Sequence, residues 1–187
     1  MSFVQRRRFL WILLLAGAAL AAVVAKATTL SHLGFEELAQ QASAVARLRC
    51  LSSNAVRDGG EIWTETQFEV LEKAKGLLGG IITVRTLGGQ ADGLHSRVEG
   101  VPQFRTGEEV YLFLWGKYGQ PFRVLGWSQG AFRIARNPQN GAAIVTQDSS
   151  AKFFDPQTRR FRQEGVRGVP LPAFQEKLRQ ALEPRGR

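Results

Sequence analysis

The chain has 187 residues, of which 44% are hydrophobic, 22% are charged and one is a cysteine. This length suffices for one domain with a substantial core, and a single cysteine excludes an internal disulfide, so packing must stabilise the fold. Lysine and arginine number 25 against 16 acidic residues, for a formal net charge of +9.

The first 27 residues have the features of a secretory signal peptide. Arginines at positions 6–8 precede an uncharged apolar run of about 17 residues at 9–25, and Ala25-Lys26-Ala27 has the small-x-small pattern of a signal-peptidase site. We expect cleavage near Ala27, a mature chain starting near Thr28, and a periplasmic or extracellular location. An uncut membrane anchor is the alternative, since the run lies at the lower limit for spanning a bilayer.

Removal of this segment changes the charge balance. Residues 1–27 contain four basic residues and no acidic one, which leaves 21 basic against 16 acidic side chains and a net charge of +5. This smaller excess weakens a nucleic-acid-binding interpretation. It is concentrated late in the chain, where it fits either an anionic surface, such as a phospholipid headgroup or an anionic polysaccharide, or an ordinary solvated face.

The first half of the mature chain predicts one helix followed by strands. Apolar residues at helical spacing predict a helix over 35–42, with Glu36 and Glu37 in its first turn. Alternating and apolar segments then predict strands at 44–51, 62–71 and 81–87. A long, glycine-rich connection follows at 88–108.

The second half predicts further strands and a last helix. Residues 109–115 are apolar on both faces, which indicates a central strand covered on both sides. Further strands are predicted at 122–127, 130–136 and 142–146. Asp155-Pro156 lies between two short segments that predict a peripheral hairpin, and Phe174, Leu178 and Leu182 lie on one side of an amphipathic C-terminal helix.

Several segments, in this order, resemble a family of uncharacterised exported bacterial proteins. They are residues 35–38, 62–70, 87–89, 101–104, 107–114 and 126–132. More distantly, the layout resembles the netrin-like domain of tissue inhibitors of metalloproteinases, through a long strand ending near Lys75-Gly76 and the Gly107-Glu108 turn into an apolar strand. This second resemblance implies an OB-type β-barrel.

We therefore expect a mainly β fold: an OB-like (netrin-like), five- to six-stranded barrel with a short N-terminal helix, a peripheral C-terminal hairpin and a C-terminal helix. Residues 28–187 would form a single domain, with its core at about 30–147 and the hairpin and helix at 148–187. The metalloproteinase inhibitors chelate the protease zinc with an N-terminal cysteine. The mature chain has no cysteine near Thr28, so the resemblance does not transfer the inhibitory residues.

Few residues favour catalysis. A catalytic nucleophile needs a neighbouring base, and the two histidines that could serve are His32 and His95. His95 lies in the long connection, near Asp92 and Ser96 in the sequence. Cys50 lies in an apolar strand and is expected to be a buried thiol. Glutamates at 61, 65 and 69 alternate on one strand face, as solvated side chains do. No metal or cofactor is expected, because the spacing of potential ligands does not fit a metal site.

Two segments are candidates for binding. The first is the connection 88–106, which contains His95, Arg97, Phe104 and Arg105 and is longer than ordinary loops. Its alternative role is structural, with Val101, Pro102 and Phe104 plugging one end of the barrel. The second candidate is the segment 126–130, where Trp127 and Gln129 lie between glycines that suggest close approach of the backbone.

Together these features predict an exported, non-catalytic binding or envelope-associated protein. Its partner would be a protein or a cell-envelope component, and not a nucleic acid. A secreted hydrolase using His95 is one alternative, and a protease-associated inhibitor or chaperone module is another. Single-stranded nucleic-acid binding, which some OB barrels perform, is disfavoured by export.

Overall fold

The computed structural model describes residues 32–148, 153–155, 158–162 and 165–183. The expected signal peptide at 1–27 and its cleavage site lie outside the described residues. Within the described residues, no helix has the length and apolar character needed to cross a membrane.

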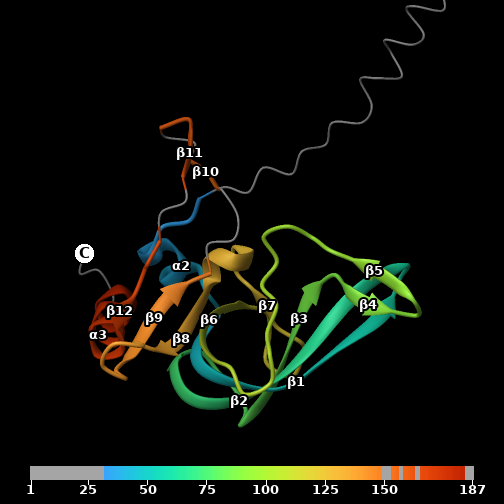
Figure 1. Ribbon diagram of the computed structural model, residues 1–187, viewed down its shortest axis with the longest axis horizontal. Coiled ribbons are helices and arrows are strands. Elements are labelled where there is room, and N and C mark those ends of the chain that lie inside the picture. Colours follow the sequence, from blue (N-terminus) through green and yellow to red (C-terminus); the bar gives the residue numbers. More distant parts are fainter. Residues whose placement is uncertain (1–31, 149–152, 156–157, 163–164, 184–187) are drawn as a thin grey trace, which may run out of the picture.

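The described chain is mainly β, with a short helix near its N-terminal end and a longer C-terminal helix (Figure 1). The helices are α2 (Phe35–Gln41), the 3-10 helix η1 (Trp127–Gly130) and α3 (Leu171–Leu182). The strands of the main sheet are β1 (Ala44–Asp58), β2 (Glu61–Lys75), β3 (Ile81–Leu87), β6 (Glu109–Trp115), β7 (Arg123–Val124), β8 (Ala131–Arg136), β9 (Ala143–Gln147) and β12 (Val169–Pro170). Two separate hairpins pair β4 (Gly89–Ala91) with β5 (Leu94–Ser96) and β10 (Phe153–Asp155) with β11 (Arg160–Arg162).

The main sheet has the order β12-β9-β8-β6-β1-β2-β3, and β7 pairs with β6. This sheet is not closed into a barrel, which corrects the expectation of a closed five- to six-stranded barrel. The segment predicted as a strand at 122–127 pairs with β6 only through the two residues of β7, because Gly126 (φ 64°) and Trp127 (φ 58°) turn the chain into η1. β3 meets this segment through one parallel bridge, between Val84 and Phe122.

β1 and β2 form a ribbon that is longer than predicted. They pair in antiparallel fashion from Val45↔Lys75 to Asp58↔Glu61, and Gly59 and Gly60 turn the chain with φ of 59° and 85°. The polar residues at 52–54 do not predict a strand, but pairing with β2 satisfies their backbone hydrogen-bonding groups. Figure 1 shows this ribbon extending away from α2 and α3, toward the β4–β5 hairpin.

β6 lies in the interior of the sheet and has a hydrophobic core on each face, as its sequence predicted. Val110, Leu112 and Leu114 belong to the first core, which also contains residues of β1, β2 and β3. Tyr111 and Phe113 belong to the second core, where α2 and α3 cover the sheet. The last residue of the strand, Trp115, is the exception, because it is 58% exposed.

The C-terminal helix and the peripheral hairpin agree with the sequence-based expectation. Phe174 and Leu178 of α3 are buried and Leu182 is partly buried against the second core. β10 and β11 form a two-stranded sheet of their own, which stands away from the main sheet in Figure 1.

The buried hydroxyl of Tyr111 links the sheet to α3. It donates a hydrogen bond of 2.8 Å to Glu72 Oε2 and accepts one of 3.1 Å from Gln175 Nε2. Burial, and then the hydrogen bond to Glu72, raise the pKa of Tyr111 to about 12. A tyrosine in an unfolded chain has a pKa of about 10. At a pH between this value and about 12, the phenol of Tyr111 is therefore protonated in the folded protein and deprotonated in the unfolded chain.

Tyr111 should consequently titrate late in an alkaline absorbance titration of the folded protein. The folded pKa is raised, so its contribution to stability is complete below about pH 10 and is lost as the pH rises toward about 12. We expect a phenolate absorbance phase near pH 12 that is missing in Tyr111→Phe and retained in Tyr118→Phe, which removes the only other tyrosine. A late phase that survives in Tyr111→Phe would contradict this assignment.

A tryptophan–arginine cleft as the candidate functional site

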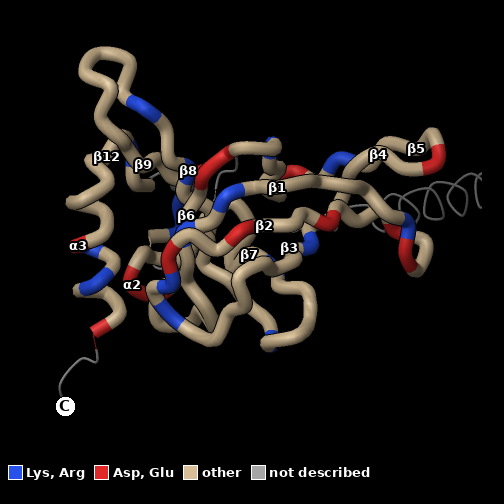
Figure 2. The backbone as a smooth tube through the Cα atoms, turned by 90° about the horizontal axis from the view of Figure 1, so that it is seen from below, with Lys and Arg blue, Asp and Glu red and all other residues tan. Residues whose placement is uncertain are grey.

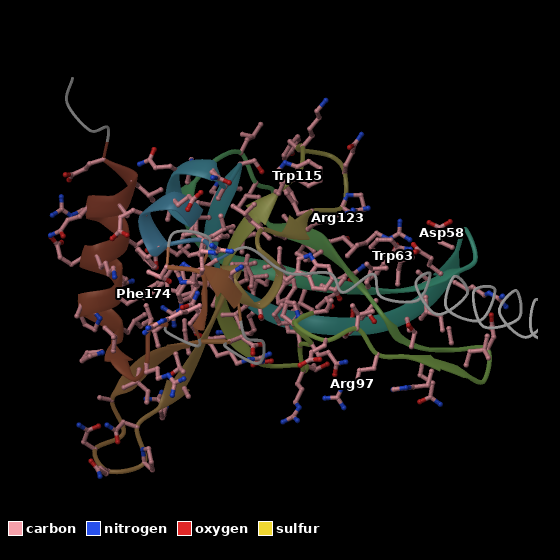
Figure 3. The ribbon with its side chains drawn as sticks, turned by 90° about the horizontal axis from the view of Figure 1, so that it is seen from above. Asp58, Trp63, Arg97, Trp115, Arg123 and Phe174 are labelled. Atoms are coloured by element: carbon pink, nitrogen blue, oxygen red, sulfur yellow. The ribbon has the colours of Figure 1, made fainter. Side chains whose placement is uncertain are left out.

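The structure separates most of the six predicted binding residues. His95 is exposed in the β4–β5 hairpin, opposite Gln90. Arg97 and Arg105 are also exposed, and Figure 3 shows Arg97 on the opposite side of the fold from Trp115. The long connection therefore does not assemble its polar residues into one site.

Phe104 is a core residue and not part of an exposed binding surface. Its side chain is buried in the first core, and its ring packs edge-on against Phe68 with 5.1 Å between ring centroids. Gln129 is also buried: its side-chain oxygen accepts a hydrogen bond of 2.8 Å from the backbone N–H of Leu33, and its backbone oxygen accepts one of 2.6 Å from Gln147 Nε2. Gln129 thus joins three separate segments of the fold.

Trp127 is the one predicted residue that lines a cleft. The cleft has a volume of about 300 Å³ and lies where β3 meets β7. Its lining contains the three tryptophans Trp63, Trp115 and Trp127 and the two arginines Arg85 and Arg123, together with apolar residues. These are all of the tryptophans that the structure describes, since the fourth in the sequence is Trp11.

Strand pairing explains why these side chains lie on one surface. Trp115 of β6 is directly opposite Arg123 of β7, so both side chains project from the same face. Val84 and Phe122, which form the bridge between β3 and β7, both point into the first core. Their successors in sequence, Arg85 and Arg123, therefore project together on the outer face.

Trp63 of β2 lies on the same surface, next to Arg85. It pairs with Leu87 of β3, and Arg85 lies two residues from Leu87 on the same face. Figure 3 shows Trp115, Arg123 and Trp63 following one another along one side of the molecule. The row Trp115–Arg123–Arg85–Trp63 thus crosses four strands, of which β2 and β3 are distant from β6 in the sequence.

Arg85 has its charge compensated within the protein. Its Nη2 lies 2.9 Å from Asp58 Oδ2 and its Nε lies 3.2 Å from Glu65 Oε1, although the buried Nε makes no well-oriented hydrogen bond with the described residues. Its guanidinium also lies over the ring of Trp63, 5.1 Å from the centroid. This arginine is therefore committed to the protein's own carboxylates and positions the indole.

Arg123 differs from Arg85 in this respect. Its guanidinium lies over the Trp63 ring at 4.9 Å from the centroid, and the side chain is exposed. No carboxylate among the described residues forms an ion pair with it. Arg123 therefore supplies a positive charge, next to an aromatic surface, that is available to a ligand.

The described residues do not form a metal site, and the Cys50 thiol is not activated as a nucleophile. Within the described residues, no group of three or more histidine, cysteine, aspartate or glutamate side chains is placed to hold a metal ion. Cys50 is buried, and burial, followed by the negative charge of Glu108, raises the pKa of its thiol. The protonated thiol is a poor nucleophile. Figure 2 shows basic and acidic residues interspersed along β1, β2 and α3.

Sequence reasoning missed Trp63, Trp115, Arg85 and Arg123. One local signal was present: Trp63 lies on the glutamate-bearing face of an alternating strand, where a large aromatic side chain is not needed by the core. The position of Arg123 next to that indole could not be read from the sequence, because it depends on the meeting of β3 with β7.

Comparisons with protein families, with curated proteins and with solved structures found no match to this chain. The two resemblances drawn from the sequence therefore remain expectations.

Proposed function

We propose that this protein is an exported, non-catalytic binding module whose binding site is the tryptophan–arginine cleft. The observation that carries the proposal is the gathering of every described tryptophan around one cleft, beside an arginine without a carboxylate partner among the described residues. Exposed aromatic side chains beside an arginine are a common composition of binding surfaces. The partner would be a protein or a component of the cell envelope.

The export part of the proposal is supported by the sequence of residues 1–27. We further propose an OB-like arrangement related to the netrin-like domain. It is supported by the order of β1, β2, β3 and β6 and by two hydrogen bonds of 2.8 Å, from Phe122 N–H to the Thr83 oxygen and from Arg85 N–H to the Phe122 oxygen. A longer β7 would extend this parallel contact into the fifth strand of such an arrangement.

The alternatives receive less support. His95 is exposed on a hairpin opposite Gln90, so a hydrolase would need its catalytic partners from elsewhere. An inhibitor or chaperone module attached to a protease is compatible with the same cleft, but no particular contact favours it over binding to the envelope.

The proposal predicts that capture of a partner depends on the cleft and not on the β4–β5 hairpin. The wild-type protein and His95→Ala should both recover the partner from an envelope extract. Trp115→Ala should bind the same partner with an affinity at least about 10-fold lower. Trp115 is 58% exposed, so its replacement should leave stability nearly unchanged, which thermal unfolding checks.

Two outcomes would contradict this prediction. The first is recovery of no partner above a control resin that carries no protein. The second is loss of the partner in His95→Ala with retention in Trp115→Ala, which would move the binding site to the hairpin.

A further inference from the structure

We infer that the tryptophan–arginine cleft binds a saccharide unit that carries a carboxylate, such as a uronic acid of an anionic glycan. This inference rests on the proposed function and specifies its ligand class. Three features of the cleft lead to it: the indoles of its lining, of which Trp115 is exposed and Trp63 and Trp127 are partly buried, the guanidinium of Arg123, which no described carboxylate pairs, and the volume.

The indoles provide flat surfaces with partial negative charge on their faces. A pyranose ring presents a face of C–H groups with partial positive charge, and its hydroxyl groups remain at the rim. Trp115 is well exposed at the cleft and Trp127 is half-buried in its wall, so a ring can lie against aromatic surface without displacing core side chains. Such packing favours a sugar ring over a fully hydrated ion.

The guanidinium of Arg123 provides the complement to a carboxylate. Its planar fork can donate two parallel hydrogen bonds to a carboxylate, which adds orientation to the charge interaction. Arg123 and Trp115 are direct cross-strand neighbours, so one ligand can contact both. The contact of Arg123 with Trp63, at 4.9 Å from the ring centroid, keeps the guanidinium beside the aromatic surface.

The charge count of the cleft distinguishes this ligand from a nucleic acid. Asp58 and Glu65 already pair with Arg85, which leaves one of the two arginines available. Binding to a phosphate backbone uses several cations along the strand, whereas in this cleft only Arg123 lacks a carboxylate partner among the described residues. A uronic acid carries one carboxylate for each ring, which matches the one guanidinium of Arg123.

The volume sets the length of the bound segment. About 300 Å³ lies at the lower end of the range for small-ligand sites, so the cleft accommodates a short segment of a glycan. A proline-rich peptide also docks on aromatic grooves, but its recognition does not require a cation among them. The dependence of binding on Arg123 therefore separates these two occupants.

The test is a titration of the ¹⁵N-labelled full-length protein with tri-galacturonate, followed through the indole N–H signals. Each tryptophan gives its own signal, so Trp11 is distinguished from the three cleft residues. We expect saturable shifts of the Trp63 and Trp115 signals. The same trisaccharide with its carboxyl groups reduced to alcohols should bind at least about 10-fold more weakly.

Two arginine variants provide a matched pair. Arg123→Gln should weaken tri-galacturonate binding at least about 10-fold, whereas Arg105→Gln, which removes an exposed arginine outside the cleft, should leave it unchanged. Equal binding of the reduced trisaccharide, or equal binding by Arg123→Gln, would overturn the inference. So would shifts of the same signals by pentathymidylate or a proline decapeptide when tri-galacturonate causes none, or no shift with any of these probes.

The outcome also separates this inference from the proposed function. If Trp115→Ala abolishes capture of an envelope partner but tri-galacturonate does not bind, the ligand class is wrong and the binding module stands. If neither depends on the cleft, both are wrong.

Discussion

Replacing Phe174 by alanine should lower the free energy of unfolding by about 3–5 kcal/mol. Phe174 is fully buried in the second core. Its ring lies 5.6 Å from that of Phe35, 5.1 Å from that of Tyr111 and 5.3 Å from that of Phe132, between centroids. The substitution would remove aromatic contacts on three sides and leave a cavity that the sheet cannot collapse to fill.

The size of this effect follows from the way in which α3 is attached. A helix of 12 residues is marginal by itself, and its stability derives from the packing of its apolar face. Phe174 touches both α2 and the sheet, so its loss weakens the attachment of α3 to both. Because whole domains are stable by only about 5–15 kcal/mol, the variant would be close to unfolding.

Urea unfolding monitored by circular dichroism provides the measurement. Phe174→Leu, which retains most of the buried volume, is the matched control and should cost much less than the alanine variant. A loss of less than about 1 kcal/mol for Phe174→Ala would show that α3 is not held by this residue.

Replacing Arg133 by methionine should cost about 2–3 kcal/mol, because it leaves two carboxylates without their cation. Arg133 of β8 forms ion pairs with Glu108 and, at 2.7 Å, with Asp148 Oδ2. Its Nη2 also donates a hydrogen bond of 2.8 Å to the backbone oxygen of Gln103. Its guanidinium lies over the ring of Phe104, 5.8 Å from the centroid. The network joins the end of the long connection to β8 and to the residue after β9.

The charged state of Arg133 is reinforced by its partners. Burial acts to lower the pKa of the guanidinium, but hydrogen bonds to Asp148 and Glu108 outweigh it and raise the pKa. The side chains of Asp148 and Glu108 are 15% and 19% exposed, so water can stabilise them only in part after the arginine is removed. We place the cost below that of a completely buried pair for this reason.

Arg136→Met is the control for this prediction, since Arg136 lies on the same strand, is exposed and donates to the backbone oxygen of Gly141. It should change the free energy of unfolding by less than about 0.5 kcal/mol. Adding Glu108→Gln and Asp148→Asn to Arg133→Met should recover part of the loss. Equal effects of Arg133→Met and Arg136→Met would contradict the role of the network.

The sequence predicted well those elements in which the local pattern of apolar residues matches the faces that are buried in a core. β3 and β6 have the predicted bounds, because alternation and a continuous apolar run reflect which faces of a strand are buried. The amphipathic pattern around Phe174 located α3 in the same way. In these segments the burial pattern is a local property of the chain.

The elements that the sequence predicted poorly depend on pairing or on turn geometry. β1 continues through polar residues because β2 lies alongside it. The connection after β3 forms the β4–β5 hairpin, in which Asp92 has a φ of 52° and Gly93 a φ of 73°. β7 is short because the chain turns at Gly126, and this leaves the sheet open where a closed barrel was expected.

The sequence by itself thus determined helices α2 and α3, the two-sided strand β6 and the net charge, and residues 1–27 favour export. The tertiary structure alone decided the candidate site. Trp63, Trp115 and Arg123 lie on separate strands, and their side chains meet because the curved sheet brings β3 against β7. Proximity of that kind arises from long-range pairing, which a local pattern of residues does not encode.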